Sequence, residues 1–172
     1  MFAEKYNPLF QEELEISKGP VAFVANWLRE HGDDVINWSE KLTVAKDYTQ
    51  YRDHQDNGDI WWRVGYGGVW HRLEVKHRPD LKFTCAEEWP HFFKPGPLVC
   101  AVHAWDKADP KIWGIMSLNS PMTHFLFIRP ETRRYWTKVE IWDKRFQCKQ
   151  WTYVCPTERV TFHPISLEKP DE

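Results

Sequence analysis

A glycine-rich turn between two strand-like segments is the feature that most constrains the fold of this chain. Residues 59–64 and 69–77 have the composition of β-strands, and the segment Gly65-Tyr66-Gly67-Gly68 separates them. Such a turn typically joins two antiparallel strands as a β-hairpin. If the hairpin is symmetric about the middle of the turn, Asp59 lies directly opposite Glu74.

The pairing of Asp59 with Glu74 predicts a site for a divalent cation. Residues opposite each other on one face have Cβ atoms about 5 Å apart, and two carboxylates that close repel each other unless a positive charge neutralises them. Lys76 lies two residues beyond Glu74 and therefore on the same face. Carboxylate oxygens are the ligands that Mg²⁺ prefers. Leu73 and Val75 point to the opposite face and into the core.

The fold class expected from the whole chain is α/β (α+β), with a central mixed β-sheet flanked by helices. The leading element is an amphipathic helix at residues 17–30, because its apolar residues follow helical spacing. Pro20 is expected in the first turn of this helix and Gly32 at its end. Residues 10–16 can form a short helix of their own.

The second half of the chain is expected to consist mainly of strands. Thr84 and Glu87 have the spacing of a capping box, which predicts a short helix that ends near Pro90. Further strands are expected at residues 35–36, 98–105, 112–118, 124–129, 135–142, 150–155 and 159–163.

Length, charge and cysteine spacing exclude few functions. A chain of 172 residues can bury its core as one domain. The net charge of −2 gives no overall attraction to nucleic acid, so any such contact requires a local basic patch. The four cysteines show no CxxC spacing, which argues against a zinc site and favours the reducing cytoplasm. The sequence shows no signal peptide and no stretch long enough to span a membrane.

Gly58-Asp59 begins one strand of the hairpin, and Glu74-Val75-Lys76 lies on the other. This arrangement resembles the PD-(D/E)XK (restriction-endonuclease-like) nuclease superfamily. The order of elements over residues 17–93 is also similar: a leading helix, a polar loop, a Gly-Asp strand and an ExK strand followed by a helix. The resemblance implies a single nuclease-like domain over residues 1–172, with a restriction-endonuclease-like core at about 17–130 and a strand-rich part at 131–165.

The resemblance also implies roles for individual residues. Asp59 and Glu74 are expected to ligate Mg²⁺ (or Mn²⁺), with the carbonyl of Val75 as a further ligand. Lys76 is expected to position the attacking water and to offset charge on the phosphate. The implied function is hydrolysis of phosphodiester bonds in DNA, in a bacterial or host-cell cytoplasm, by a monomer or a homodimer.

One departure from the family pattern leaves alternatives open. Many members carry a further glutamate on the leading helix, and here Glu13, Glu15 and Glu30 are the candidates, although none matches that position well. The chain can therefore also be a catalytically inactive, nuclease-like module that binds nucleic acid or serves in assembly. A third possibility is that the carboxylates are structural and the aromatic-rich sheet binds proteins.

Four residues around the hairpin are candidates for contacts with nucleic acid. Arg72, His77 and Arg78 are basic neighbours of Lys76 that can bind phosphates. Trp61 shares the face of Asp59 and can stack on a base. The alternatives are an ordinary exposed strand end for the basic residues and a core position for Trp61.

Overall fold

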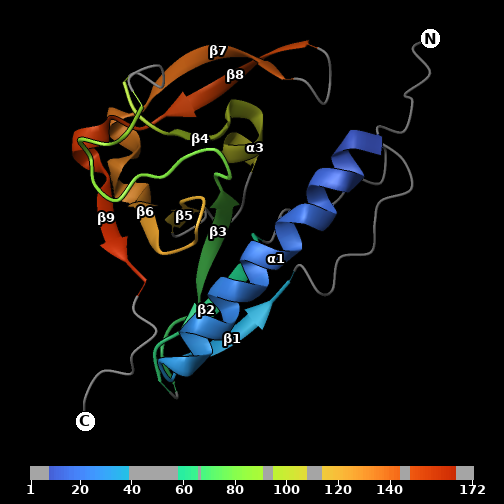
Figure 1. The fold of residues 1–172 in the computed structure, drawn as a ribbon, viewed down its shortest axis with the longest axis vertical. Coiled ribbons are helices and arrows are strands. Elements are labelled where there is room, and N and C mark those ends of the chain that lie inside the picture. Colours follow the sequence, from blue (N-terminus) through green and yellow to red (C-terminus); the bar gives the residue numbers. More distant parts are fainter. Residues whose placement is uncertain are drawn as a thin grey trace.

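The computed structural model of the chain describes residues 8–38, 58–65, 67–90, 95–107, 114–143 and 148–165. Figure 1 shows a long helix, α1, lying across one face of a sheet, and a hairpin of β7 and β8 that projects at the other end of the molecule. The content is mixed α+β, as expected from the sequence. In the described part of the chain, no helix is long and apolar enough to cross a membrane.

Helix α1 spans Pro8–Glu30 without interruption. The separate helices expected at residues 10–16 and 17–30 are therefore wrong, because Pro20 lies inside α1 and is buried there. A proline in a helix interior removes one backbone hydrogen bond. Packing of the apolar stripe of α1 on the sheet offsets that loss; this stripe consists of Val21, Val24, Ala25 and Leu28.

Gly32 ends α1, as expected. Its φ of 87° is a left-handed conformation that glycine adopts without steric cost. The Gly32 amide donates to the carbonyl of Arg29 at 3.0 Å, and the Asp33 amide donates to the carbonyl of Leu28 at 3.2 Å. These two bonds form a Schellman cap, which turns the chain from the helix into the first strand.

The main sheet has six strands in the order β1-β2-β3-β5-β6-β9. Only the pairing of β3 with β5 is parallel, so the sheet is mixed, as predicted. Its strands are β1 Asp34–Asn37, β2 Ile60–Arg63, β3 His71–His77, β5 Gly114–Leu118, β6 His124–Ile128 and β9 Thr161–Pro164.

A second, antiparallel sheet has three strands in the order β4-β8-β7, which corrects the expectation of a single sheet. Its strands are β4 Leu98–Ala101, β7 Thr137–Asp143 and β8 Cys148–Val154. The strand expected at residues 98–105 is half wrong, because helix α3 (Val102–Lys107) follows β4 directly. Helical spacing there directs both Val102 and Trp105 toward the core.

The short helix expected after Thr84 does not form, because the described residues 78–90 make turns and bends instead. Glu88 rather than Glu87 binds Thr84: its Oε2 accepts from the Thr84 backbone amide at 2.7 Å and from the Thr84 hydroxyl at 2.8 Å. Short 3-10 helices, η2 (Pro130–Tyr135) and η3 (Thr157–Arg159), precede β7 and β9.

The two faces of the main sheet pack against different partners. We call the side of β3 that carries Leu73 and Val75 the helix face, because these residues pack in one core cluster with α1. We call the opposite side, which carries Glu74 and Lys76, the site face. Farther along the sheet, the site face carries Ile115 and is covered by the cluster that contains α3 and the second sheet.

Candidate active site

The register of the β2–β3 hairpin confirms the symmetry expected from its turn. Trp61 pairs with Arg72, and Ile60 pairs with Leu73. One step further along this register, Asp59 lies across from Glu74, just before β2 begins. The Asp59 amide donates to the carbonyl of Leu73 at 3.1 Å, which continues the ladder to this point. Tyr66, at the middle of the turn, lies outside the described residues.

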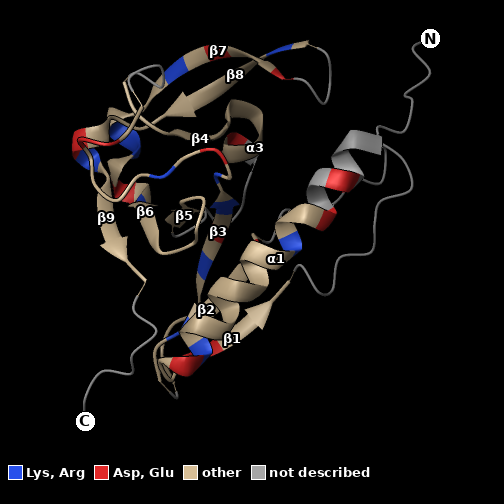
Figure 2. Ribbon diagram, in the orientation of Figure 1, with Lys and Arg blue, Asp and Glu red and all other residues tan. Residues whose placement is uncertain are grey.

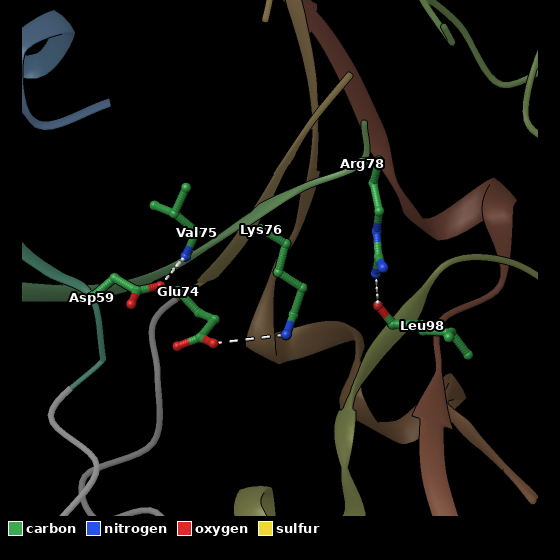
Figure 3. Close-up of polar contacts among 6 residues, drawn as sticks. All are labelled: Asp59, Glu74, Val75, Lys76, Arg78 and Leu98. Atoms are coloured by element: carbon green, nitrogen blue, oxygen red, sulfur yellow. Dashed lines mark hydrogen bonds and ion pairs between the residues drawn. The ribbon is translucent and has the colours of Figure 1, made fainter. Parts of the chain in front are cut away.

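The carboxylate of Asp59 is held by the backbone of β3. Its Oδ2 accepts a 2.7 Å hydrogen bond from the amide of Val75, as Figure 3 shows. Gly58, which precedes it, has a φ of 70° and so turns the chain into β2. In an extended strand the amide and the carbonyl of one residue face the same edge. The Val75 carbonyl therefore also faces the edge of β3 that Asp59 occupies.

Glu74 and Lys76 extend together from the site face. Lys76 Nζ lies 3.7 Å from Glu74 Oε1, and the two side chains are 25% and 24% exposed. Figure 3 shows both side chains on one side of β3, with Val75 on the other. The alternation expected from the sequence is thus present: the charged residues share one face, and Val75 is buried with the helix.

Strand β5 forms the other side of the site. Its parallel register with β3 places Ile115 beside Glu74 and Ser117 beside Lys76. Ser117 is completely buried, and its hydroxyl has no hydrogen-bond partner among the described residues. The sequence interpretation did not include Ser117. Its signal was a single hydroxyl within the otherwise apolar segment Ile115-Met116-Ser117-Leu118.

Trp61 and Arg72 form a contact with each other on the site face. The guanidinium of Arg72 lies 4.6 Å from the centroid of the Trp61 ring, and Arg72 is only 9% exposed. Trp61 also makes an edge-on contact with Trp38 at 5.5 Å between ring centroids. A residue that binds phosphates must be accessible to DNA, and Arg72 is more deeply buried than that expected role requires.

The structure does not bring His77 and Arg78 to one surface. His77 shares the helix face with Leu73 and Val75, and its Nε2 lies 3.2 Å from the carbonyl oxygen of Ser120. Arg78 extends to the side of Lys76, as Figure 3 shows, and donates to the carbonyl of Leu98 at 3.3 Å. Burial lowers the pKa of the Arg78 guanidinium. Arg78 therefore ties the end of β3 to the start of β4.

The two third-acid candidates whose side chains are described, Glu15 and Glu30, do not join Asp59 and Glu74. Glu15 is exposed on α1 and forms a 2.6 Å ion pair with Lys18. Glu30 is exposed at the last position of α1. The side chain of Glu13 lies outside the described part of the chain. Among the described residues, no three His, Cys, Asp or Glu side chains gather as a metal-binding group.

Charge is distributed unevenly around this site. Figure 2 shows basic residues along β3, and separate groups of basic and acidic residues at the 3-10 helices and on β7. The Lys and Arg residues of β3 itself are Arg72 and Lys76.

No protein-family model, no curated protein and no solved structure matches this chain.

Proposed function

We propose that this protein is a metal-dependent nuclease that hydrolyses phosphodiester bonds of DNA, with Asp59, Glu74 and Lys76 as its catalytic residues. The observation that carries the proposal is the register of the hairpin, which brings Asp59 to the edge of β3 beside Glu74. The order of elements also supports it: a leading helix, then β1, β2 and β3, with the Gly-Asp pair directly before β2 and the Glu-Val-Lys segment within β3.

The oxygen atoms at this edge suit Mg²⁺ or Mn²⁺. Two carboxylates, Asp59 and Glu74, and the Val75 carbonyl are hard ligands, which these cations prefer over nitrogen or sulfur. Mg²⁺ typically takes one or two carboxylates from a protein and completes its shell with water and phosphate oxygens. The hydrogen bond from Val75 to Oδ2 fixes the orientation of the Asp59 carboxylate.

A bound divalent cation would supply the positive charge that makes a water acidic enough to attack and that offsets the charge of the phosphate. Lys76 adds a second positive charge on the same face, where its ammonium can orient the attacking water by donating a hydrogen bond. The oxygen of that water would attack phosphorus as its proton passes to the surrounding water. The bond from phosphorus to the leaving oxygen then breaks, and that oxygen takes a proton back from the surrounding water.

DNA cleavage by matched variants tests the proposal. Supercoiled plasmid and linear duplex are incubated with Mg²⁺, Mn²⁺ or EDTA, using the wild type, Glu74→Gln and Lys76→Met. The control is a pair on the second sheet, Glu140→Gln and Lys149→Met, whose ion pair is 3.1 Å long. We expect EDTA and both site variants to abolish cleavage and both control variants to cleave like the wild type.

Two other results would replace the proposal. Wild type and site variants that bind DNA equally but never cleave it would support an inactive, nuclease-like binding module. A protein that neither binds nor cleaves DNA would instead favour a structural role for the carboxylates. Gel filtration of the same samples, with and without DNA, tests whether the active form is a homodimer. Location in the cytoplasm is part of the same proposal.

A further inference from the structure

Ser117 is a polar residue in a place that normally holds an apolar one. All five residues of β5 are buried, and Ser117 is 0% exposed. Its hydroxyl oxygen is buried without a hydrogen-bond partner in the described part of the protein. Buried polar groups are almost always hydrogen-bonded, because an unsatisfied group loses its contact with water and gains nothing. An unpaired hydroxyl here needs an explanation.

The position of Ser117 relates it to Lys76. The two residues are directly opposite in the parallel register of β3 and β5, and neighbouring strands lie about 4.8 Å apart. Residues opposite each other in a sheet share a face, so the Ser117 hydroxyl lies on the site face. The ammonium of Lys76 has three hydrogens to donate. On the site face, it can reach an acceptor on the neighbouring strand β5.

The Glu74 carboxylate competes with the Ser117 hydroxyl for the ammonium of Lys76. Lys76 Nζ lies 3.7 Å from Glu74 Oε1, which is longer than a good hydrogen bond between charged groups. A cation on the Glu74 carboxylate would weaken this pair, because the carboxylate charge is then shared with the metal. Lys76 would then need another acceptor on the site face, and Ser117 supplies one beside it.

We propose that Ser117 is a positioning residue, whose hydroxyl oxygen accepts a hydrogen bond from Lys76 when a divalent cation binds Glu74. This inference rests on the proposed nuclease function. The hydrogen bond fixes one of the three ammonium hydrogens on β5 and leaves the other two for water and phosphate. The same contact satisfies the buried hydroxyl, which explains why a serine stands between Met116 and Leu118.

The experiment compares Ser117→Ala with Ser117→Thr, which keeps a hydroxyl, and with the matched control Ser120→Ala. Backbone groups of Ser120 make the bonds to His77 and Leu81, so this control leaves those bonds in place. Thermal unfolding is followed in EDTA and in saturating Mg²⁺ without DNA, so that one readout is independent of turnover. Each variant is also made with Lys76→Met, and kcat and KM for DNA cleavage are measured separately.

We expect Ser117→Ala to unfold in EDTA at the same temperature as the wild type or higher, since the lost hydroxyl has no partner there. In Mg²⁺ the rise in Tm should be smaller for Ser117→Ala than for the wild type, and Lys76→Met should remove this difference. The loss of one hydrogen bond to a charged group predicts a fall in kcat of about tenfold, with KM unchanged. Ser117→Thr should retain most of the activity, and Ser120→Ala all of it.

Two results would overturn the assignment while the nuclease function stands. One is a wild type that cleaves DNA with Ser117→Ala equal to it in both kcat and the response of Tm to Mg²⁺. The other is a Ser117→Ala variant that is destabilised in EDTA in proportion to its loss of activity, which indicates a structural role. If Mg²⁺ changes neither the Tm nor the DNA cleavage of the wild type, the proposed function fails and the role of Ser117 fails with it.

Discussion

The backbone amide of Val75 donates a 2.7 Å hydrogen bond to Oδ2 of Asp59. This bond joins the residue before β2 to the middle of the Glu-Val-Lys segment of β3, so Asp59 both stabilises the hairpin and faces the candidate metal site. If the proposed function is correct, Asp59 has two separable functions. One depends on an acceptor oxygen at this position, and the other depends on its negative charge.

Asp59→Asn and Asp59→Ala should separate these functions. Asparagine keeps an oxygen that can accept from Val75 but carries no charge, so we expect stability close to that of the wild type and cleavage reduced by more than about 100-fold. Alanine leaves the Val75 amide without its acceptor, which should lower the free energy of unfolding by about 1–3 kcal/mol. Urea unfolding and plasmid cleavage measure the two effects. An active Asp59→Asn variant would show that the charge is not used in catalysis.

Gly58 should be needed for the geometry of Asp59. Its φ is 70°, and a Cβ at this position would lie 3.4 Å from the carbonyl oxygen of Leu73. We expect Gly58→Ala to lower stability by about 1–2 kcal/mol, because a side chain is strained in this conformation, and to reduce cleavage as Asp59 shifts.

Gly19→Ala is the matched control for that substitution. Gly19 lies within α1, and beyond its chain neighbours and the backbone of its own helix an added Cβ would meet no described atom within 4 Å. The change should alter the free energy of unfolding by less than about 1 kcal/mol, because the helix preference of alanine is opposed by contact of the new Cβ with the ring of Pro20. Cleavage should be unaffected. Equal stability losses for Gly58→Ala and Gly19→Ala would contradict the strain argument.

The hairpin was the part of the fold that could be predicted most fully, and the reason is local. A glycine-rich turn fixes the register, and the two-residue period of a strand then places Glu74 and Lys76 on one face and Val75 on the other. The same period would have placed His77 with Leu73 and Val75 on the helix face. The basic run Lys76-His77-Arg78 groups His77 with its charged neighbours, whereas strand alternation predicts its face correctly.

The rest of the fold depends on contacts between distant residues, which local patterns do not contain. The pairing of β4 with β8 joins Leu98 to Val154, and this pairing creates the second sheet. The parallel pairing of Lys76 with Ser117 likewise has no local signal. At the start of the chain, Pro20 suggested that a helix begins there, but packing against the sheet sustains one helix through it. Ser117 was missed because its significance depends on its neighbour across the sheet.

The cysteines should differ in reactivity according to their burial. All four are free thiols; Cys155 is 0% exposed, and Cys148 is exposed at the start of β8. Burial raises the pKa of Cys155 above its ordinary value of 9.0, so the reactive thiolate is suppressed. We expect iodoacetamide at pH 8 to label Cys148 in minutes and Cys155 only after unfolding, as measured by peptide mass spectrometry.

The raised pKa of Cys155 also predicts how the free energy of unfolding changes with pH. Because the folded-state pKa lies above the unfolded value of 9.0, the contribution of the neutral thiol is complete below that pH. It is lost as the pH rises through the folded-state pKa. Urea unfolding between pH 7 and pH 10 should therefore show a decline above about pH 9 that is smaller in Cys155→Ala than in the wild type. Rapid labelling of Cys155 in the folded protein would contradict both expectations.

Arg72 is expected to stabilise the hairpin rather than to bind DNA. Its guanidinium lies 4.6 Å from the centre of the Trp61 ring, and the residue is 9% exposed. Arg72→Lys keeps the charge but loses the planar group that covers the ring, so stability should fall by about 1 kcal/mol. Arg134→Lys is the control, because Arg134 is exposed and its guanidinium lies 4.8 Å from the centre of the Tyr135 ring. This substitution should lower the free energy of unfolding by less than about 0.5 kcal/mol.

Fluorescence anisotropy with a labelled duplex, measured at several salt concentrations, should give the same affinity for wild type and Arg72→Lys. A weaker affinity without a loss of stability would show that Arg72 contacts the phosphates, because lysine cannot reproduce the two-pronged hydrogen bonding of a guanidinium.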